Sequence, residues 1–484
     1  MSNMDCAVTM PRDGSGPLSR QLAAHLRALI KGGRYAAGQR LPSVRALAAR
    51  NALSTQTVVE AYAQLMAAGF VVSRRGSGYF AAERGSEPGP ALVRMREQLD
   101  PRRLGREVLT DTSAVVRLGG GGLSPEWIDH VEIESALRRC ARGVLPRFGA
   151  YGSTQGYAPL RALLASGLGA KGIQVPASHI LMCHGATQAI DLAIRVLTRA
   201  EQTVLVDDPG YFQTTWALKV HGAKVVGVPR TDSGPDPQAF ERLCVETGAK
   251  VFFTQSALHN PTGSMLTLGV AYELLRTAER HGVTIVEDDV SGDLAPDTAP
   301  RLAMLDQLQR VLYIGSFSKT LSPSLRVGYL ATRREDLLDE LTRRKLVSSY
   351  VSCEPNESIV HTLMVDGHYA RHVRRLERRL KERALQALPA LQALGFVPGQ
   401  NQPSYAGGTS LWLRHRSGAD ALTLANEAAA SGILLAPGCV FRPNEESSQF
   451  FRFVLPLCTE RAIAALAGVV QAQPGSRAAP PLEG

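Results

Sequence analysis

Hydrophobic positions follow two different periods along the chain. Near the N-terminus they recur every three or four residues, as expected for one face of a helix. Three such groups are Leu18, Leu22, Leu26 and Leu29; then Val44, Leu47 and Ala48; then Val58, Tyr62, Leu65 and Met66. From about residue 180 onward, short apolar runs alternate with helical stretches. This pattern predicts a small helical module followed by a large α/β module.

The small module carries the signals that begin and end short helices. Ser43 is placed to cap the second helix, and Ser54 the third. Two short apolar runs follow, at 70–72 and 79–81, and the segment between them contains Arg74-Arg75-Gly76-Ser77-Gly78. We therefore expect a β-hairpin with a basic tip after the third helix.

Seven apolar runs of β type predict the sheet of the large module. They lie at residues 180–182, 203–206, 224–228, 251–253, 283–286, 311–314 and 327–330. Because helical stretches separate them, we expect a mostly parallel sheet with ligands at the carboxyl ends of its strands. The predicted divisions are the small module at 15–82, a linker at 83–115, the large module at 116–472 and a disordered tail at 473–484.

The composition is that of an ordinary soluble globular protein, with 44% hydrophobic and 20% charged residues in a chain of 484. No stretch approaches the roughly 18 apolar residues of a membrane span, and the N-terminus has no apolar signal core. We expect a cytoplasmic protein with no membrane partner. The seven cysteines never form a Cys-x-x-Cys pair, which argues against a metal site or a disulfide framework.

Positive charge is concentrated in the small module. The whole chain has a net charge of +10, and residues 1–85 contain eleven Lys and Arg against four Asp and Glu, a net charge of +7. This asymmetry is typical of a nucleic-acid reader joined to another module. The predicted start of the third helix offers short hydrogen-bonding side chains to the major groove of double-stranded DNA. The alternative is a generic three-helix domain with a solvated basic surface.

The segments 39–48, 54–58 and Gly76-Ser77-Gly78 closely resemble the winged helix-turn-helix of GntR-type bacterial regulators. The resemblance implies that the chain binds an operator in double-stranded DNA. The residues implied to contact DNA are Arg45, Ser54, Thr55, Gln56, Thr57, Arg75 and Gly76. Many relatives have an arginine where this chain has Thr55.

Polar residues follow three strands of the predicted large module in succession: Asn260, Asp288 and Lys319. Lys319 is an amine that can form a Schiff base with a carbonyl, provided that burial or a neighbouring cation lowers its pKa. Ser316, Ser318 and Arg326 offer hydrogen-bond donors to a phosphate. A phosphorylated pyridine aldehyde suits this set, since a carboxylate can hold its ring nitrogen and an amide its phenolic oxygen. Each residue taken singly also has an ordinary explanation: Lys319 can be a solvated surface lysine, and Asn260 can simply form a turn.

Two further positions fit the same ligand. Gly185-Ala186-Thr187 opens a predicted helix and can present backbone N–H groups to an anion. Tyr211 follows another strand and can stack on a ring, although ordinary packing explains it equally well when it is considered alone.

Residues 117–470 resemble, in motif type, order and spacing, the fold-type I aminotransferases that depend on pyridoxal 5′-phosphate (PLP). The resemblance implies a large domain with a mostly parallel sheet and a smaller α+β domain. The residues implied to bind the cofactor are Tyr151, Gly185, Ala186, Thr187, Tyr211, Asn260, Asp288, Ser316, Ser318, Lys319 and Arg326. Lys319 is implied to be the catalytic lysine that holds PLP as an aldimine, and Arg452 to bind a substrate carboxylate. In a homodimer, Tyr151 is implied to reach the phosphate site of the other subunit.

One position departs from the aminotransferase pattern. The family usually has a tyrosine in the segment 288–294, where it tunes the aldimine, and this chain has Ser291 at the corresponding place. Cofactor binding is expected to survive this change. We expect at most weak or half-reaction transaminase activity.

A GntR-like reader joined to an aminotransferase-like module resembles the MocR family of bacterial transcriptional regulators. The resemblance implies a dimeric regulator that senses PLP, an amino compound as effector, or both, through aldimine exchange at Lys319. The alternative from another class is a working aminotransferase that carries a DNA-binding head. A third possibility is a regulator with a vestigial PLP site. The operator, the effector and the sign of regulation are not written in the sequence.

Overall fold

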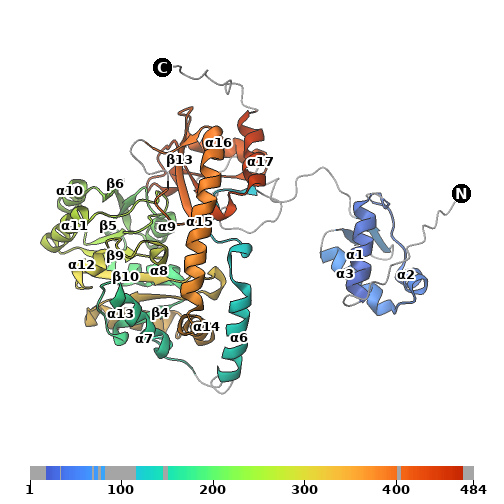
Figure 1. Cartoon of the computed structure of the whole chain (residues 1–484), viewed down its shortest axis with the longest axis horizontal. Coiled ribbons are helices and arrows are strands. Elements are labelled where there is room, and N and C mark those ends of the chain that lie inside the picture. Colours follow the sequence, from blue (N-terminus) through green and yellow to red (C-terminus); the bar gives the residue numbers. More distant parts are fainter. Residues whose placement is uncertain are drawn as a thin grey trace. The chain divides into compact units, whose positions relative to one another are not determined.

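The computed structural model describes residues 18–32, 34–36, 38–67, 70–74, 78–81, 116–144, 151–399 and 405–471. The chain divides into two compact units, residues 1–93 and 94–484, which are described separately below as the head and the effector module (Figure 1). The predicted linker at 83–115 and the predicted tail at 473–484 lie outside the described residues.

The head consists of three helices and a two-stranded antiparallel sheet. Its elements are α1 (Leu18–Lys31), α2 (Val44–Asn51), α3 (Thr55–Ala67), β1 (Val71–Arg74) and β2 (Gly78–Ala81). The side-chain oxygen of Ser43 accepts a hydrogen bond from the backbone N–H of Ala46 at 3.2 Å, and that of Ser54 accepts one from Thr57 at 3.0 Å. Both serines therefore cap helices as predicted, because they satisfy N–H groups that the first turn leaves free.

Tyr62 on α3 joins the helices of the head to its hairpin. It is fully buried, its ring stacks on that of Tyr79 in β2 with centroids 4.2 Å apart, and its hydroxyl donates to the carbonyl of Pro42 at 2.6 Å. The other buried positions include the predicted helical residues Leu22, Leu26, Leu47, Val58 and Leu65, whereas Leu18 at the start of α1 is exposed. The winged helix-turn-helix fold predicted from the sequence is therefore confirmed.

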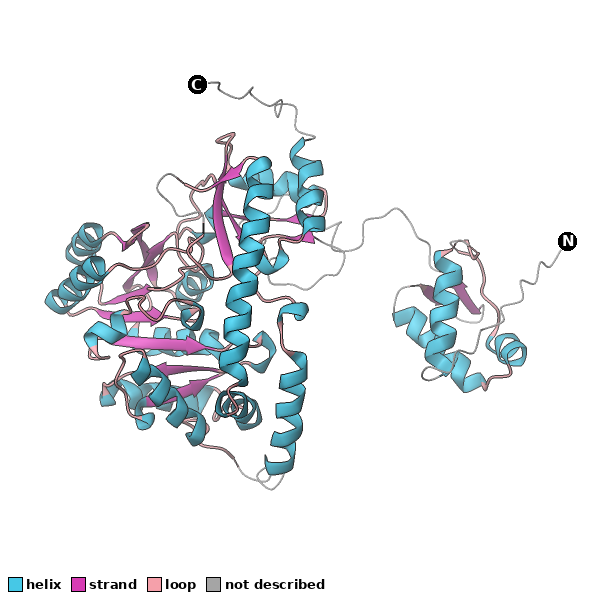
Figure 2. Cartoon of the chain, viewed as in Figure 1, coloured by secondary structure: helices cyan, strands magenta, loops and turns pink. Residues whose placement is uncertain are grey.

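The effector module is built on an eight-stranded sheet with the order β4-β11-β10-β9-β8-β5-β6-β7 (Figure 2). The strands are β4 (Ile180–Cys183), β5 (Thr203–Asp208), β6 (Lys224–Thr231), β7 (Gly234–Pro235), β8 (Val251–Thr254), β9 (Thr284–Asp288), β10 (Val311–Ser316) and β11 (Gly328–Ala331). The neighbours from β6 to β10 pair in parallel, whereas β4, β11 and β7 pair antiparallel. The seven predicted runs are thus all strands of one mostly parallel sheet.

Helices cover both faces of this sheet, which explains why its strands are apolar at nearly every position. Successive strand residues enter different clusters: Leu312 and Ile314 pack on one face, and Val311 and Tyr313 on the other. The helices of this part are α6 (His130–Val144), α7 (Ala158–Ala170), α8 (Gly185–Leu197), α9 (Phe212–His221), α10 (Pro237–Thr247), α11 (Leu268–His281), α12 (Leu302–Asp306), α13 (Glu335–Ser348) and α14 (Glu354–Val365).

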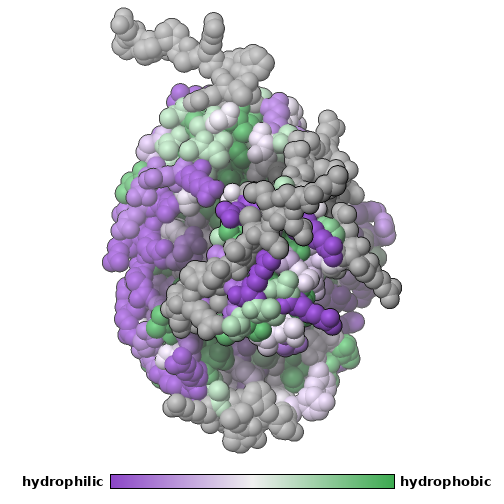
Figure 3. Space-filling view, turned by 90° about the vertical axis from the view of Figure 1, so that its right-hand side faces the viewer, coloured by the Kyte–Doolittle hydropathy of each residue, from purple (hydrophilic) through white to green (hydrophobic). Residues whose placement is uncertain are grey.

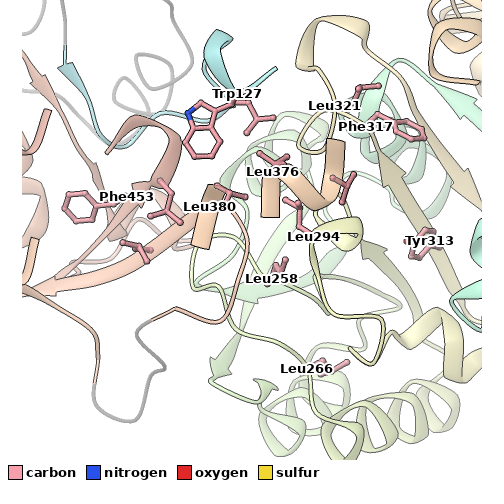
Figure 4. Close-up of a cluster of buried hydrophobic side chains, with 14 of the residues drawn as sticks. Trp127, Leu258, Leu266, Leu294, Tyr313, Phe317, Leu321, Leu376, Leu380 and Phe453 are labelled. Atoms are coloured by element: carbon pink, nitrogen blue, oxygen red, sulfur yellow. The ribbon is translucent and has the colours of Figure 1, made fainter. Parts of the chain in front are cut away.

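A smaller α+β part completes the effector module. Its four-stranded sheet has the order β12-β13-β16-β15, formed by β12 (Phe396–Val397), β13 (Ser410–His415), β16 (Phe450–Val454) and β15 (Ala436–Pro437). A second sheet pairs β14 (Ile433–Leu434) with β3 (Val116–Arg117), and the helices are α15 (His368–Ala393), α16 (Ala421–Ala430) and α17 (Glu460–Gln471). Figure 4 shows that Leu376 and Leu380 of α15 lie between Trp127, Phe453 and residues of the large sheet. One core therefore joins the two parts of the module.

Across the described ranges, no helix combines the length and the apolar character that a membrane crossing requires.

Candidate functional site

A cavity of about 640 Å³ lies at the carboxyl ends of the central strands. Eight of the residues predicted to bind a cofactor line it: Ala186, Thr187, Tyr211, Asn260, Ser316, Ser318, Lys319 and Arg326. A narrower pocket of about 30 Å³ adjoins it, shares Asn260 and Lys319 with it, and adds Arg452. The topology explains this convergence, since parallel strands bring the residues that follow them to one edge of the sheet.

Lys319 lies in the loop after β10, and its ammonium group donates a hydrogen bond to the carbonyl of Gly121. Burial lowers the pKa of Lys319 to about 8; Arg452 and Arg326 act in the same direction, and Asp288 opposes them. A buried lysine next to two arginines is costly in its charged form. The site therefore holds an amine with nucleophilic character near neutral pH.

Asp288 is the last residue of β9 and is 5% exposed. Its Oδ2 atom accepts a hydrogen bond from Nε2 of Gln255 at 2.8 Å, whereas Oδ1 is buried without a hydrogen-bond partner among the described residues. Burial raises the pKa of Asp288 to about 6, and the bond from Gln255 opposes that rise. An unpartnered buried carboxylate oxygen costs free energy unless a donor completes it. Asp288 thus offers one free acceptor to a protonated ring nitrogen.

The opposite end of the cavity is suited to an anion. α8 begins at Gly185 with a φ of 74°, so the N–H groups of its first turn point out of the helix. A Cβ atom at Gly185 would lie 2.8 Å from Nη2 of Arg326, which itself donates to the carbonyl of His184 at 3.1 Å. The hydroxyls of Ser316 and Ser318 lie 3.2 Å apart beside them. Glycine is therefore required for the guanidinium to lie against the helix terminus.

Arg452 on β16 is 3% exposed and bridges the two parts of the module. One terminal nitrogen donates to Oδ1 of Asn260 at 3.0 Å, and the other donates to the carbonyls of Gly119 and Gly120 at 2.8 and 3.1 Å. Its guanidinium carbon also lies 4.9 Å from the ring centre of Phe441. Because Oδ1 of Asn260 accepts from Arg452, the amide nitrogen of Asn260 is the group left to donate to a ligand.

A buried ionic cluster supports Asn260 from behind. Asp207 at the end of β5 lies 3.0 Å from Nη1 of Arg230 and 3.5 Å from Nε2 of His259, the residue before Asn260. Burial lowers the pKa of His259 to about 4, and Arg230 contributes to that shift, so the ring is neutral. Its other nitrogen lies 2.8 Å from the hydroxyl of Thr262. These contacts fix the turn that carries Asn260.

Three further residues singled out in the sequence lie at different places relative to the cavity. The hydroxyl of Tyr211 donates to Gln213 at the wall of the cavity. Ser291, the predicted departure from the aminotransferase pattern, lines the narrower pocket. Tyr151 is 82% exposed and packs against Tyr350 instead of entering the cavity of its own subunit.

The predicted DNA-binding residues of the head divide into two kinds. The side chains of Ser54 and Thr57 bond each other at 2.8 Å, and Ser54 also caps α3. Arg45, Thr55 and Gln56 are exposed, and Gln56 donates to Glu60 at 3.3 Å. Arg75 and Gly76 lie outside the described residues. Thr55 and Gln56 are thus exposed polar side chains at the start of α3, and their contact with bases stays a prediction.

The prediction from sequence missed two components of the site. The first is the run Gly119–Gly122, whose backbone lies against Lys319 and Arg452. Four consecutive glycines in the sequence could have indicated it, because glycine lets the backbone approach other groups closely. Gln255 follows β8 and holds both Asp288 and the backbone N–H of Asn260, the latter at 2.7 Å. The sequence could have indicated Gln255, because it closely follows a predicted strand, as the other site residues lie near strand ends.

Comparison with known proteins agrees with both units. Residues 118–470 match the family of class I and II aminotransferases, and residues 18–80 match the gntR family of bacterial regulatory proteins. The HTH-type transcriptional regulator TauR of Rhodobacter capsulatus is 30% identical over 461 residues, which span 91% of this chain and 93% of TauR. The HTH-type transcriptional regulator YdfD of Bacillus subtilis is 29% identical over 90% of this chain and 92% of its own.

Among solved structures, the chain is similar to LysN, the alpha-aminoadipate aminotransferase of Thermus thermophilus, in complex with N-(5′-phosphopyridoxyl)-L-leucine. The TM-score is 0.67 at 26% identity, over 78% of this chain and 95% of LysN. The fold and these matches define a GntR-type reader joined to an aminotransferase-like module. The chain belongs to the class I and II aminotransferase family and, with its gntR-family head, to the MocR-type transcriptional regulators.

The family is PLP-dependent, and the residues of this cavity fit that cofactor. The free Oδ1 of Asp288 suits the ring nitrogen, and the terminus of α8 with Arg326 suits the phosphate. Three cations, Lys319, Arg326 and Arg452, influence one another here with Asp288 as the opposing carboxylate. This imbalance favours an anionic ligand over a neutral one.

Capture of PLP by the cofactor-free protein is expected to depend strongly on pH. Because burial lowers the pKa of Lys319 to about 8, its neutral fraction at pH 7 is about 300 times that of a lysine with the ordinary pKa of 10.5, and capture should be faster in proportion. The rate should rise up to about pH 8. Below about pH 6, Asp288 is protonated and affinity should fall. The measurement is the initial rate of absorbance change on adding PLP; Asp288→Asn should remove the lower transition and leave the upper one.

Proposed function

We propose that this transcriptional regulator binds PLP covalently at Lys319 and senses PLP, an amino compound, or both. The observation that carries the proposal is a cavity lined by a nucleophilic amine and an anion cradle. The carboxylate of Asp288 lies behind the lining residue Gln255, acts electrostatically on Lys319 and keeps one unpartnered buried oxygen. A vestigial site would not be expected to keep a buried unpartnered Asp288, because an apolar replacement would be less costly.

When bound, PLP supplies an aldehyde that condenses with amines and a ring that withdraws electrons. The residues of this chain bind the cofactor and orient its reactive groups. Lys319 provides the neutral amine, Asp288 holds a proton on the ring nitrogen, and the amide of Asn260 donates to the phenolic oxygen. Arg326 and the first turn of α8 hold the phosphate. Gln255 positions two of these groups at once, because it bonds both Asp288 and Asn260.

We propose that Arg452 receives the carboxylate of the amino compound and thereby links the site to the head. Its donors are now used by the carbonyls of Gly119 and Gly120, which a carboxylate would displace because a charged acceptor binds a guanidinium more strongly. The glycine run follows β3, and β3 begins one residue after the predicted linker. Ligand binding at Arg452 therefore acts on the segment from which the tether starts. Coupling arises because the ligand favours the arrangement in which the glycine carbonyls are released.

We also propose a homodimer in which Tyr151 reaches the phosphate site of a second subunit. Support comes from the exposure of Tyr151 together with that of Tyr350 and Val347, which are 49% and 81% exposed. Large apolar side chains that gather on a surface commonly mark an interface.

A second candidate function is a working aminotransferase, favoured because Asp288 and Arg452 both act electrostatically on Lys319. Against it, Ser291 occupies the place of the tyrosine that aminotransferases usually have. We propose at most weak or half-reaction activity.

The test measures binding of PLP-loaded protein to its own upstream DNA, at several salt concentrations, with a panel of amino acids and amines. Repeated turnover of amino acid and keto acid, without salt-dependent preference for that DNA, would identify an enzyme.

Replacing Arg45 with alanine is expected to weaken operator binding about tenfold. Arg45 is exposed in the first turn of α2, and the loss of one phosphate contact should reduce the slope of log affinity against log salt by about 1. PLP absorbance should stay unchanged, because the head and the effector module have separate cores. Fluorescence anisotropy gives the affinity. Arg50→Ala, on the last turn of the same helix, serves as the matched control, and loss of PLP in Arg45→Ala would contradict the modular interpretation.

A further inference from the structure

Helix α15 carries a concentration of positive charge that the proposed function does not use. Its 26 residues contain six arginines and one lysine against two glutamates, a net charge of +5. Residues 86–484 as a whole carry +3, so the rest of that stretch carries −2. The net positive charge of residues 86–484 is therefore contributed by α15, since the other residues of this stretch together carry a small net negative charge.

The cations of α15 form two rows, and only one of them has a structural role. Arg375 pairs with Asp129, and the guanidinium carbon of Arg379 lies 4.3 Å from the ring centre of Trp127. These two residues hold the start of the module against the helix. The second row, which we call the outer row, consists of Arg371, Arg374, Arg378 and Lys381, and all four are exposed.

The outer row is regular and almost straight. Its members are spaced by three, four and three residues, which places them on one face of a helix. The row spans about 15 Å at 1.5 Å per residue. Leu376, Leu380 and Ala384 lie on the opposite, buried face. Figure 3 shows hydrophilic side chains along one border of the effector module.

Two exposed glutamates of α15, Glu377 and Glu382, lie beside the outer row and offset its four positive charges only in part. Arg378 lies 3.8 Å from Glu382, but both side chains are more than half exposed, and such pairs contribute almost nothing to stability. Arg374 and Lys381 form no ion pair with any residue that the structure describes. Like charges three or four residues apart on a helix repel one another. Repulsion within the row therefore destabilises the helix slightly, and a bound polyanion would relieve that repulsion.

We propose that the outer row of α15 binds phosphates of the DNA that flanks the operator. The chain already holds duplex DNA through its head, so DNA is the polyanion present whenever the regulator is bound. One strand presents a phosphate every 3.4 Å along the axis, so about four phosphates lie along a row of 15 Å. The effector module thereby lengthens the DNA footprint beyond the bases that the head reads, and adds affinity without sequence preference.

The experiment compares two full-length triple variants on two DNA fragments. The first variant is Arg374→Gln, Arg378→Gln and Lys381→Gln in the outer row. The control is Arg242→Gln, Arg276→Gln and Arg280→Gln, which removes the same charge from the exposed surfaces of α10 and α11. One fragment ends at the operator, as mapped by footprinting in the upstream region, and the other extends about two helical turns further on each side.

The outer-row variant should bind the long fragment at least about tenfold more weakly, with a salt slope reduced by about 2 to 3, and bind the short fragment as the natural protein does. The control variant should lose little, and equally on both fragments. Equal losses by the outer-row variant on both fragments, or no loss on the long one, would overturn the proposal. A change in its sedimentation mass would also overturn it, because the row would then be a contact between subunits.

Discussion

Replacing Lys319 with alanine is expected to abolish covalent capture of PLP completely while leaving the DNA contacts of the head intact. The loss is complete because a Schiff base needs a primary amine, and the described cavity offers no second lysine among its lining residues. Borohydride reduction followed by peptide mapping should label Lys319 in the natural protein and give no label at this site in the variant.

Lys319→Arg is the matched control for this prediction. It keeps a positive charge beside Gly121 and Asp288 but cannot form the covalent bond, so it separates loss of charge from loss of the amine. Both variants should bind a short operator fragment when no ligand is present. The assignment of Lys319 as the PLP-binding lysine would be contradicted if folded Lys319→Arg failed to bind that fragment. It would also be contradicted if borohydride reduction fixed PLP on another lysine of the natural protein.

Replacing Arg452 with glutamine is expected to weaken binding of carboxylate-bearing amino compounds about 100-fold. The guanidinium offers two donors in a buried site, and hydrogen bonds to charged groups contribute roughly 1.5–3 kcal/mol each, so a loss of about 3 kcal/mol is a cautious expectation. PLP capture itself should persist, because Arg326, the proposed phosphate ligand, lines the larger cavity whereas Arg452 lines the narrower pocket. The measurement is titration of the PLP absorbance with an amino acid.

The control for Arg452 is a change of ligand. An amine of the same chain length that lacks the carboxylate should bind the natural protein and the variant equally. If the variant weakens both ligands by the same factor, Arg452 supports the site without recognising the carboxylate. Sensitivity of DNA binding to the amino acid should disappear in the variant, since the carbonyls of Gly119 and Gly120 would no longer be exchanged for a ligand on Arg452.

The local features of this protein could be read from its sequence. Helices of the head, their serine caps and the seven strand runs depend on spacing and on residue type within a few positions, and the structure agrees with them. Lys319, Asn260 and Asp288 could be grouped for a related reason. Each lies at the carboxyl end of a strand or in the loop that follows it, so the parallel topology brings them to the same edge of the sheet.

Only the tertiary structure decided which distant segments complete the site. Arg452 bonds the carbonyl of Gly119, a residue 333 positions away, because the smaller sheet packs beside the start of the module. Gln255 holds Asp288 and Asn260 together, and Tyr151 lies exposed against Tyr350 and does not line the cavity. In α15 the sequence shows a basic helix, but only packing separates the engaged Arg375 and Arg379 from the exposed outer row. Local spacing determines elements and strand-end chemistry, whereas contacts between elements depend on how their buried faces fit, which no short pattern encodes.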